Sequence, residues 1–385
     1  MEAPATRSVN GGLLVLLSLV AAVTVGNLYL AQPLLAAIGR DLHAGSTAIG
    51  AVVTFSQIGY GTGVLFIVPL GDLIERRRLI LTLLAAVLGF LLLASVSPSL
   101  PMLVGASLLI GVSTVIPQIV VPYAASLAAD RDRAAVLGTV QGGLLLGILL
   151  ARVFSGGIAA VVGWRGVFVV AAGLCGLLGV VVRWRLPLQP STVRTSYGHA
   201  LASMLTLLRR EPVLRRTSVV AALNFAIFTS FWTTLPFLLE SSFGKGPAAA
   251  GLFGLLGAVG AVVASLAGKL IDRKGTHFTL VAALIVTLAS FGAFWFGARS
   301  LVWLAVGVAV MDAGVQATHL ACQAEALSLD PAARSRINGV YMFLRFAGGA
   351  AGSALGSLCW ARWGWTGFCV SGLAIAVTPF MYLPR

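Results

Sequence analysis

Apolar residues run through the chain in blocks of about 20, separated by short clusters that contain charges, glycine or proline. An α-helix rises about 1.5 Å per residue, so such a block crosses the roughly 30 Å hydrocarbon core of a bilayer. Each block is therefore expected to be a membrane-spanning helix. Cutting the sequence at the polar clusters predicts twelve spans, at residues 11–37, 46–70, 79–97, 100–128, 134–162, 166–185, 217–240, 247–270, 277–298, 300–325, 334–361 and 365–383.

The longest stretch between two predicted spans is the polar, basic segment 186–216. It divides the chain into an N-terminal six-helix bundle (1–185), a central loop and a C-terminal six-helix bundle (217–385). Within the loop, 200–210 is expected to form a short amphipathic helix on the membrane surface. The predicted fold class is an all-α polytopic membrane protein with twelve transmembrane helices.

Composition strengthens this prediction. Of the 385 residues, 58% are hydrophobic and 10% are charged, and the mean hydropathy is +0.98. Soluble domains carry about 25% charged residues, so this chain lacks the polar side chains needed to cover a water-facing surface. The four cysteines lie in apolar segments without the spacing of a metal site or a disulfide framework, and no metal is expected.

The formal net charge of +14 permits two interpretations, binding to nucleic acid or retention of cationic loops in the cytoplasm. With both termini placed in the cytoplasm, 19 of the 26 Lys and Arg residues fall in inner segments and 5 in outer loops. This bias is the positive-inside rule of membrane proteins. The expected partners are the lipid bilayer and a small-molecule substrate, and no nucleic acid.

Asp312 is the one acid near the middle of a predicted span. An ionisable residue at membrane depth is costly and is a functional-site candidate by default. Asp312, Gln316, His319 and Gln323 recur at i, i+4, i+7 and i+11, which places them within an arc of roughly 60° on a helix. The tenth span therefore presents one narrow polar face.

The eleventh span offers Asp312 a partner. Arg345 lies at nearly the same depth, on a face that also carries Asn338 and Tyr341, so an ion pair is possible. Two roles stay open: a static pair, or a carboxylate that takes a proton in one conformation and pairs with Arg345 in the other.

Two further polar residues in spans each allow two interpretations. His319 either titrates near neutral pH or forms hydrogen bonds in a pocket. Arg152, in the fifth span, either partners an acid or an anion, or extends its side chain to the interface.

The sequence also repeats itself. GDLIERRRLI at 71–80 and GKLIDRKGTH at 268–277 share a glycine, a leucine, an acid and an arginine. A second match aligns the fifth and eleventh spans at a constant offset of 201 residues (334 − 133), with the pairs Arg133/Arg334, Gly138/Gly339, Gly147/Gly348, Gly163/Gly364, Trp164/Trp365 and Gly166/Gly367. The halves are thus expected to be copies of like topology, related by an axis along the membrane normal. Glycines at small-xxx-small spacing, such as Gly143/Gly147, are expected to serve packing within the bundle.

Six plus six spans, a basic central loop and the motif G-x-L-x-D/E-R after spans two and eight resemble the major facilitator superfamily over essentially the whole chain. The family's loop motif is G-x-L-x-D-R-x-G-R-R, and the first copy here lacks the x-G pair. The resemblance implies that the two phrases form a latch on the cytoplasmic side, with Glu75 and Asp272 pairing with nearby arginines or facing a helix N-terminus across the interface between the halves. The latch residues are Gly71, Glu75, Arg76, Gly268, Asp272 and Arg273.

Within the superfamily the chain is most similar to bacterial drug:proton antiporter-type exporters, although its fourth span lacks an arginine and its fifth lacks a Gly-Pro pair. The resemblance implies proton-coupled efflux by alternating access in the bacterial cytoplasmic (inner) membrane, by a monomer that needs no cofactor besides the proton gradient. It also implies that spans 1, 4, 7 and 10 line a central cavity. Prolines 33, 117, 122 and 236 lie in spans 1, 4 and 7, where they either kink the helix in a way that suits gating or are simply tolerated, as proline is in membrane helices. Residues that fit the cavity are Tyr29, Gln32, Gln118, Asn224 and Trp232.

Other function classes can be weighed from motifs. A membrane enzyme would need a Ser/His or paired-Asp arrangement, an H-E-x-x-H or an Asp-rich metal motif, and the sequence has none. No Walker loop is present, so ATP is not the expected energy source. An uptake carrier, or a sensor or scaffold that kept the fold without transport, stays open.

Overall fold

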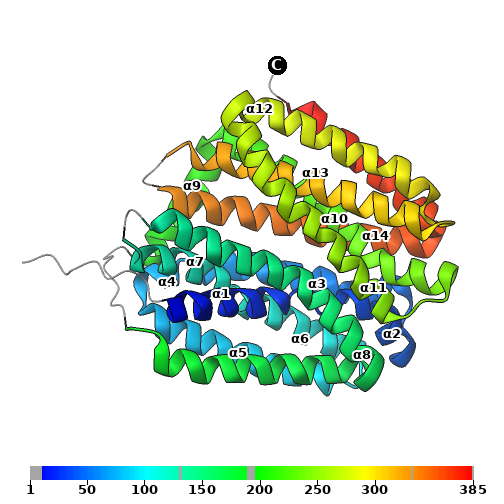
Figure 1. Ribbon diagram of the computed structural model, residues 1–385, viewed down its shortest axis with the longest axis horizontal. Helices are drawn as coiled ribbons and strands as arrows, with labels where there is room; N and C mark the ends of the chain where they lie inside the picture. The colour runs from blue at the N-terminus through cyan, green and yellow to red at the C-terminus, as the bar shows by residue number, and fades with distance from the viewer. Residues whose placement is uncertain (1–10, 130–131, 189–195, 331–332, 384–385) are drawn as a thin grey trace, which may run out of the picture.

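The computed structural model describes residues 11–129, 132–188, 196–330 and 333–383, which are helical almost throughout and contain no strand. Figure 1 shows two helical bundles side by side, α1–α8 in the first half and α10–α14 in the second. In the described ranges, nine helices are long and apolar enough to cross a membrane, and α1 is a shorter apolar helix. Four arginines counted in the charge analysis, Arg7, Arg131, Arg194 and Arg385, lie outside these ranges.

The helix bounds of the first half are α1 Gly11–Gly26, η1 Gln32–Leu34, α2 Leu35–Asp41, α3 Ser46–Phe66, α4 Leu70–Leu73, α5 Arg76–Ser95, α6 Leu100–Ser113, α7 Ile116–Leu127 and α8 Arg133–Arg185. The connecting helix α9 spans Tyr197–Arg210. The second half contains α10 Pro212–Phe243, α11 Pro247–Phe253, η2 Gly254–Gly257, α12 Ala258–Gly297, α13 Leu301–Leu327, α14 Arg334–Val377 and η4 Thr378–Tyr382.

Three of the longest helices each contain two spans, because a glycine with a left-handed backbone turns the chain between them. The φ angles are 73° at Gly163 in α8, 83° at Gly275 in α12 and 59° at Gly364 in α14. Glycine adopts positive φ readily, whereas other residues are strained there. Gly163 and Gly364 are partners in the internal repeat, so the repeat preserves a turn. With these turns the described residues form the twelve predicted spans in two halves of six.

Spans one and four are each interrupted, so neither forms one continuous helix. Span one breaks over residues 27–31, between α1 and the short helix η1 that contains Pro33, and span four breaks between α6 and α7. The carbonyls freed in span one find new donors: the Thr114 hydroxyl donates to Thr24 O at 3.2 Å, and the Ser155 hydroxyl to Leu30 O at 2.6 Å. The backbone polar groups are thus satisfied where lipid offers no partner.

The equivalent spans seven and ten, α10 and α13, are uninterrupted helices of 32 and 27 residues. Pro117 is the second residue of α7, directly after the break in span four, which agrees with a kink there. Pro122 and Pro236 lie inside helices that continue past them. The two halves therefore share a topology but differ in the continuity of these spans.

Glycines of the repeat allow close helix contacts in both halves. A Cβ added to Gly147 of α8 would overlap the Ala22 backbone of α1, and one added to Gly348 of α14 would overlap the Ala222 backbone of α10. A Cβ added to Gly143 would lie 2.9 Å from Ser18 O, which is also too close. The prediction that the small-xxx-small pairs serve packing within the bundle is confirmed.

The second half contains a buried aromatic cluster on α10, α12 and α14. Its ring centroids lie 4.6–6.3 Å apart, and the Trp365 indole donates to Phe294 O at 2.7 Å. The members are Phe231, Phe291, Phe294, Trp365 and Phe368. Among the described residues of the first half, the aromatic contact within the bundle is Trp164 with Phe168, at 6.1 Å.

The two ends of the molecule differ. We call the end that carries α9 the loop end and the opposite end the far end; in Figure 1 they lie at the left and the right. At the far end the halves touch: Arg40 forms an ion pair with Glu240 at 2.8 Å, and Ser353 donates to Gly50 O at 3.4 Å. Beside Arg40, the Asp41 carboxylate is held by the Arg165 guanidinium, which lowers the pKa of Asp41. The far end is therefore closed.

Candidate functional site

A cavity of about 740 Å³ lies between the two halves. Its wall reaches from Arg152 and Asp312, deep in the bundle, to Arg334 and Ser335, which are exposed at the loop end. None of the far-end contact residues named above lines it. The cavity is thus open at the loop end and closed at the far end.

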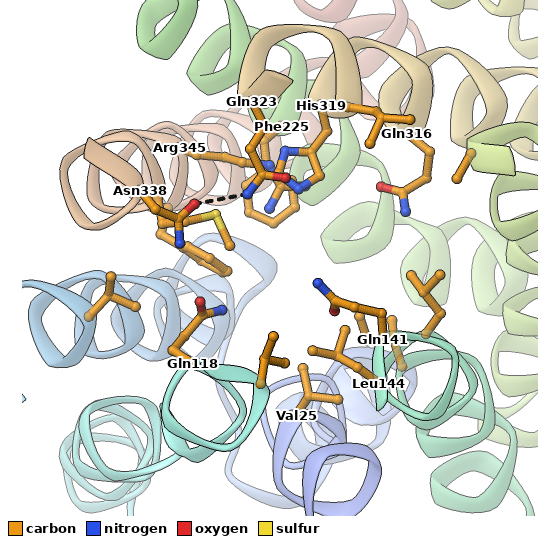
Figure 2. A pocket seen from close by; sticks show the side chains of 18 of the residues that line it. Val25, Gln118, Gln141, Leu144, Phe225, Gln316, His319, Gln323, Asn338 and Arg345 are labelled. Carbon is orange, nitrogen blue, oxygen red and sulfur yellow. Dashed lines mark hydrogen bonds between the residues drawn. The ribbon is translucent and has the colours of Figure 1, made fainter. Parts of the chain in front are cut away.

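Most of the predicted site residues line this cavity, including the whole polar face of the tenth span. Figure 2 shows Gln316, His319 and Gln323 on α13 across from Gln118 and Gln141. The lining members of the predicted set are Tyr29, Gln118, Arg152, Asp312, Gln316, His319, Gln323, Asn338 and Arg345. The helix-face prediction for α13 is confirmed, while the roles of these residues stay predictions.

Arg152 is buried, with 1% of its surface exposed, and its guanidinium is enclosed by aromatic rings. Its Cζ lies 3.9 Å from the ring centroid of Trp232, 4.9 Å from that of Tyr29 and 5.3 Å from that of Phe228. Its Nε donates to Gln32 Oε1 at 2.8 Å. Arg152 therefore does not reach the interface. Gln32 and Trp232, predicted to line the cavity, lie behind its wall and hold this side chain.

Asn224 and Tyr341 also lie behind the wall rather than on it. The Asn224 amide points between helices, 3.4 Å from both the Thr287 and the Thr318 hydroxyl oxygens. Tyr341 is fully buried and contacts His319. Both residues lie on the polar faces of their helices as predicted, but each polar face extends beyond the part that lines the cavity.

Asp312 lies deep in the cavity wall with 4% of its surface exposed, and its Oδ1 has no hydrogen-bond partner among the described residues. Arg152 is the cation that acts on it electrostatically, although no ion pair within 4.0 Å forms. The turn η2 passes beside the carboxylate, since a Cβ added to Gly257 would lie 3.1 Å from Asp312 Oδ2. The described residues contain no group of three His, Cys, Asp or Glu that could hold a metal ion.

The expected ion pair between Asp312 and Arg345 is absent from this conformation. The Arg345 Cζ lies 3.8 Å from the ring centroid of Phe225 and 5.7 Å from that of Phe346. The ionisable groups that interact with it are Tyr341, Tyr29, Tyr60 and His319, and Asp312 is not among them. Asp312 and Arg345 lie at similar depths but do not meet, because depth along a helix does not say toward which neighbouring helix a side chain points. Pairing in another conformation stays a prediction.

His319 is part of a hydrogen-bonded link between α13 and α14. Its Nδ1 lies 2.9 Å from the Tyr341 hydroxyl oxygen, and that hydroxyl donates to His319 O at 3.1 Å. The Tyr341 hydroxyl has one proton, which it uses in the hydrogen bond to the carbonyl. In the contact with the ring, Nδ1 must therefore be the donor, and Nε2 is left as an acceptor. One turn further along, Gln323 Nε2 donates to Asn338 Oδ1 at 2.9 Å. The geometry favours the hydrogen-bonding interpretation of His319.

Sequence reasoning missed four polar lining residues, Arg334 and Ser335 at the loop end and Tyr60 and Gln141 further in. Gln141 precedes Arg152 by eleven residues, the same spacing that placed Gln323 on the face of Asp312, so helical periodicity could have found it. The Tyr60 hydroxyl accepts from Gln118 Nε2 at 3.2 Å, and its ring packs at a tilt against that of Phe346, with the centroids 4.3 Å apart. No signal in the second span marks it.

The first loop phrase forms a capped turn at the loop end. The chain is extended at Ile74, and Glu75 caps α5 by accepting from the backbone N–H groups of Arg77 and Arg78, each at 2.9 Å. Arg76 donates to Gly71 O at 3.1 Å and to the Asp72 carboxylate at 3.2 Å. Glu75 thus faces a helix N-terminus as predicted, but that of its own helix.

The second loop phrase is built differently. The helix α12 continues through Gly268 and Asp272 and turns at Gly275. Asp272 and Arg273 are exposed, and neither forms a hydrogen bond or ion pair with its side chain in the described part of the chain. The position equivalent to Gly275 in the first copy is Arg78, which cannot readily take a left-handed backbone, so the first turn comes earlier and uses a cap.

Comparison with known proteins agrees with this architecture. The family model of the Major Facilitator Superfamily matches residues 17–353. The uncharacterized transporter YgaY of Escherichia coli (strain K12) is 40% identical over 96% of this chain and 94% of its own. The probable transporter SCO4007 of Streptomyces coelicolor is 38% identical over 92% and 83%. A solved bacterial homologue of the human lysosomal transporter Spinster, in an inward-facing and unoccupied conformation, matches with a TM-score of 0.74 at 14% identity, over 99% of this chain and 95% of that one.

Proposed function

Because the chain belongs to the major facilitator superfamily, a family of membrane transporters rather than enzymes, we propose that it is a secondary active transporter working by alternating access. In this mechanism a site between two halves opens to one side of the membrane at a time. The observation that carries the proposal is the cavity between the halves, which is open at the loop end and closed by direct contacts at the far end.

In this proposal the loop end faces the cytoplasm of a bacterium and the far end faces the outside of its inner membrane. The positive-inside rule supports the orientation, because cationic residues concentrate at the loop end, as in the run from Arg76 to Arg78. The conformation described here is then the one that receives or releases substrate on the cytoplasmic side. One chain contains both halves and the whole cavity, which supports function as a monomer.

We assign proton coupling to Asp312. This carboxylate belongs to the second half, and the cation that acts on it, Arg152, belongs to the first. Protonation converts the carboxylate to a neutral acid and removes an attraction between the halves, which is substantial where water is excluded. Proton binding and release would thereby bias the two halves toward separation or closure near η2. The proposed direction is efflux, by analogy with the exporters that the sequence resembles.

The proposal is tested with purified protein in proteoliposomes. A pH gradient is imposed, and movement of protons and of a panel of neutral and anionic solutes is followed. Asp312→Asn, which keeps the size of the side chain but cannot ionise, should reduce gradient-driven flux to the background of empty liposomes. Exchange of substrate across the membrane without a gradient should persist, because the cavity is preserved. Glu211→Gln, at the start of α10 and away from the cavity, is the matched control and should behave as wild type.

Each outcome separates the candidate functions. Unchanged gradient-driven flux in Asp312→Asn removes this residue from coupling. Accumulation only in the direction of the proton gradient identifies an uptake carrier in place of an exporter. Binding of solutes without flux under any gradient identifies a sensor or scaffold.

A further inference from the structure

Arg345 carries a buried positive charge that no described residue balances. Only 8% of its surface is exposed, and it lines the cavity. Its guanidinium forms no hydrogen bond or ion pair with any residue in the described ranges; its close contact is the face of Phe225. Buried charges in proteins are normally paired or hydrogen-bonded, because removing a charge from water is expensive. A guanidinium with five free N–H donors in a cavity wall is therefore a site that awaits an acceptor.

Two tyrosines beside Arg345 offer donors as well, whereas a further ionisable neighbour, His319, keeps its ring Nε2 as an acceptor. Tyr29 and Tyr60 are among its ionisable neighbours and line the same cavity. In the described part of the chain, the Tyr29 hydroxyl has no hydrogen bond, and the Tyr60 hydroxyl accepts from Gln118 but has no acceptor for its own proton. Three side chains therefore present donors to one region in which no carboxylate takes part.

The charge of the cavity wall points the same way. Its charged members are Arg152, Arg334 and Arg345 against the single acid Asp312, a formal excess of two positive charges. Asp312 already interacts with Arg152 and does not act on Arg345. A cleft that is positive and partly dry attracts anions and raises their local concentration.

On the proposed transport function, we infer that the cavity binds a small organic acid whose carboxylate is held by the Arg345 guanidinium together with the Tyr29 and Tyr60 hydroxyls. A planar guanidinium matches a carboxylate through two parallel hydrogen bonds. The body of the acid lies against the aromatic rings of Phe225 and Phe346, and its other polar groups meet the surrounding carboxamides. These are Gln118, Gln141, Gln316, Gln323 and Asn338. The volume of about 740 Å³ suits a metabolite-sized ligand.

A purely structural role for Arg345 makes a different prediction. If its stacking on Phe225 serves only to hold α14 against α10, the cavity has no reason to prefer an anion over a neutral molecule of the same shape. The comparison that decides between these roles uses pairs of ligands that differ only in the charged group.

The experiment measures binding to the purified full-length protein by calorimetry and by thermal unfolding. Two carboxylates, gluconate and phenylacetate, are each compared with an uncharged match, glucitol and phenylacetamide. At least one carboxylate should bind, and its neutral match should bind at least tenfold more weakly. Charge-assisted hydrogen bonds are strong, so Arg345→Gln should weaken carboxylate binding by roughly ten- to a hundredfold. Arg345→Lys should retain part of the affinity, and Tyr29→Phe should lose a few-fold.

Arg299→Gln is the matched control, because Arg299 is exposed at the far end and its side chain makes no contact with the cavity. It should bind the carboxylate as wild type does. The inference is overturned if neither carboxylate binds, if the neutral matches bind equally well, or if Arg345→Gln keeps wild-type affinity. The ligand pairs test the wild-type protein, so they decide the matter even if Arg345→Gln does not fold.

Failure of this inference and failure of the proposed function give different results. If proteoliposomes transport glucitol but the protein binds neither carboxylate, the transport function is supported and the anion site is rejected. Carboxylate binding without flux of any solute would retain the site and remove transport.

Discussion

A methyl group at Gly50 should weaken the far-end closure. Gly50 lies in α3, where a Cβ would overlap the Ser357 hydroxyl of α14 and come within 2.6 Å of Ser357 Cβ, while Thr233 at 3.7 Å is in ordinary contact. Ser357 cannot turn its own Cβ away, so α3 and α14 must separate. Alanine also favours the helix over glycine, but it does so in every conformation and leaves the balance between conformations unchanged.

The size of the effect follows from the overlap. Inserting a methyl group into a packed contact costs about 1–3 kcal/mol. If this cost falls only on the conformation closed at the far end, the equilibrium moves by roughly 5- to 150-fold toward the conformation open there, since about 1.36 kcal/mol is a factor of ten. Alternating access then predicts that the loop end of the cavity closes in a larger fraction of molecules.

The assay is chemical labelling from the loop side. Ser335→Cys places a thiol at the exposed mouth of the cavity, and the four native cysteines are buried. In this background Gly50→Ala should slow reaction with an impermeant maleimide. Adding Ser357→Gly, which removes the overlapping atoms, should restore the rate. Gly89→Ala, where nothing lies within 4 Å of an added Cβ, is the control.

Two results would refute the reasoning. If Gly50→Ala labels at the wild-type rate, the far-end contact does not control the loop end. If it lowers thermal stability but the labelling rate stays constant, the fold is a rigid scaffold and the two ends are not coupled.

The loop phrases and the glycine turns provide further predictions. Glu75→Gln should reduce proteoliposome flux more than Asp272→Asn. Glu75 caps α5, which contributes about 0.5–2 kcal/mol, whereas Asp272 has no described partner. Equal loss of flux would contradict the view that the two loop phrases contribute unequally. Gly163→Ala and Gly364→Ala should each lower the unfolding temperature, because a left-handed backbone costs a residue with a Cβ about 1–2 kcal/mol. Gly173→Ala, in a helical position with open space around it, is the control and should not. An unchanged unfolding temperature of Gly163→Ala would contradict the assignment of strain to that turn.

The number and order of the spans were predictable because hydrocarbon thickness sets the length of an apolar block. A kink near Pro33 was one of two open interpretations, but the extent of the break in span one was not predictable. It depends on donors elsewhere in the fold, because the Thr114 and Ser155 hydroxyls donate to carbonyls that a helix would otherwise satisfy. The continuity of α12 through Asp272 was also missed. A charged cluster was read as a loop, whereas the exposed end of a helix can extend beyond the membrane core.

The candidate site divides in the same way. Helical periodicity alone placed Asp312 and His319 on one face, since both lie on the same rigid helix. The possible pair of Asp312 with Arg345 does not form in this conformation, and Arg152 is the cation that acts on Asp312. Sequence could not decide between the two arginines, because the answer depends on the relative rotation of different helices. Rotation is set by packing contacts such as Gly147 on Ala22, which a single sequence does not display.

The unequal continuity of equivalent spans has a mechanical consequence. Spans one and four of the first half are interrupted, while α10 and α13 are unbroken and the second half is braced by its aromatic cluster. Under the same load the first half is the more compliant body and the second the stiffer one. When the far end opens, the two halves would then not move as two equally rigid bodies. The first half would bend at residues 27–31 and 114–115, while the second half would keep its shape. The two bundles thus share a topology but differ in stiffness, and the first half is the one expected to deform during transport.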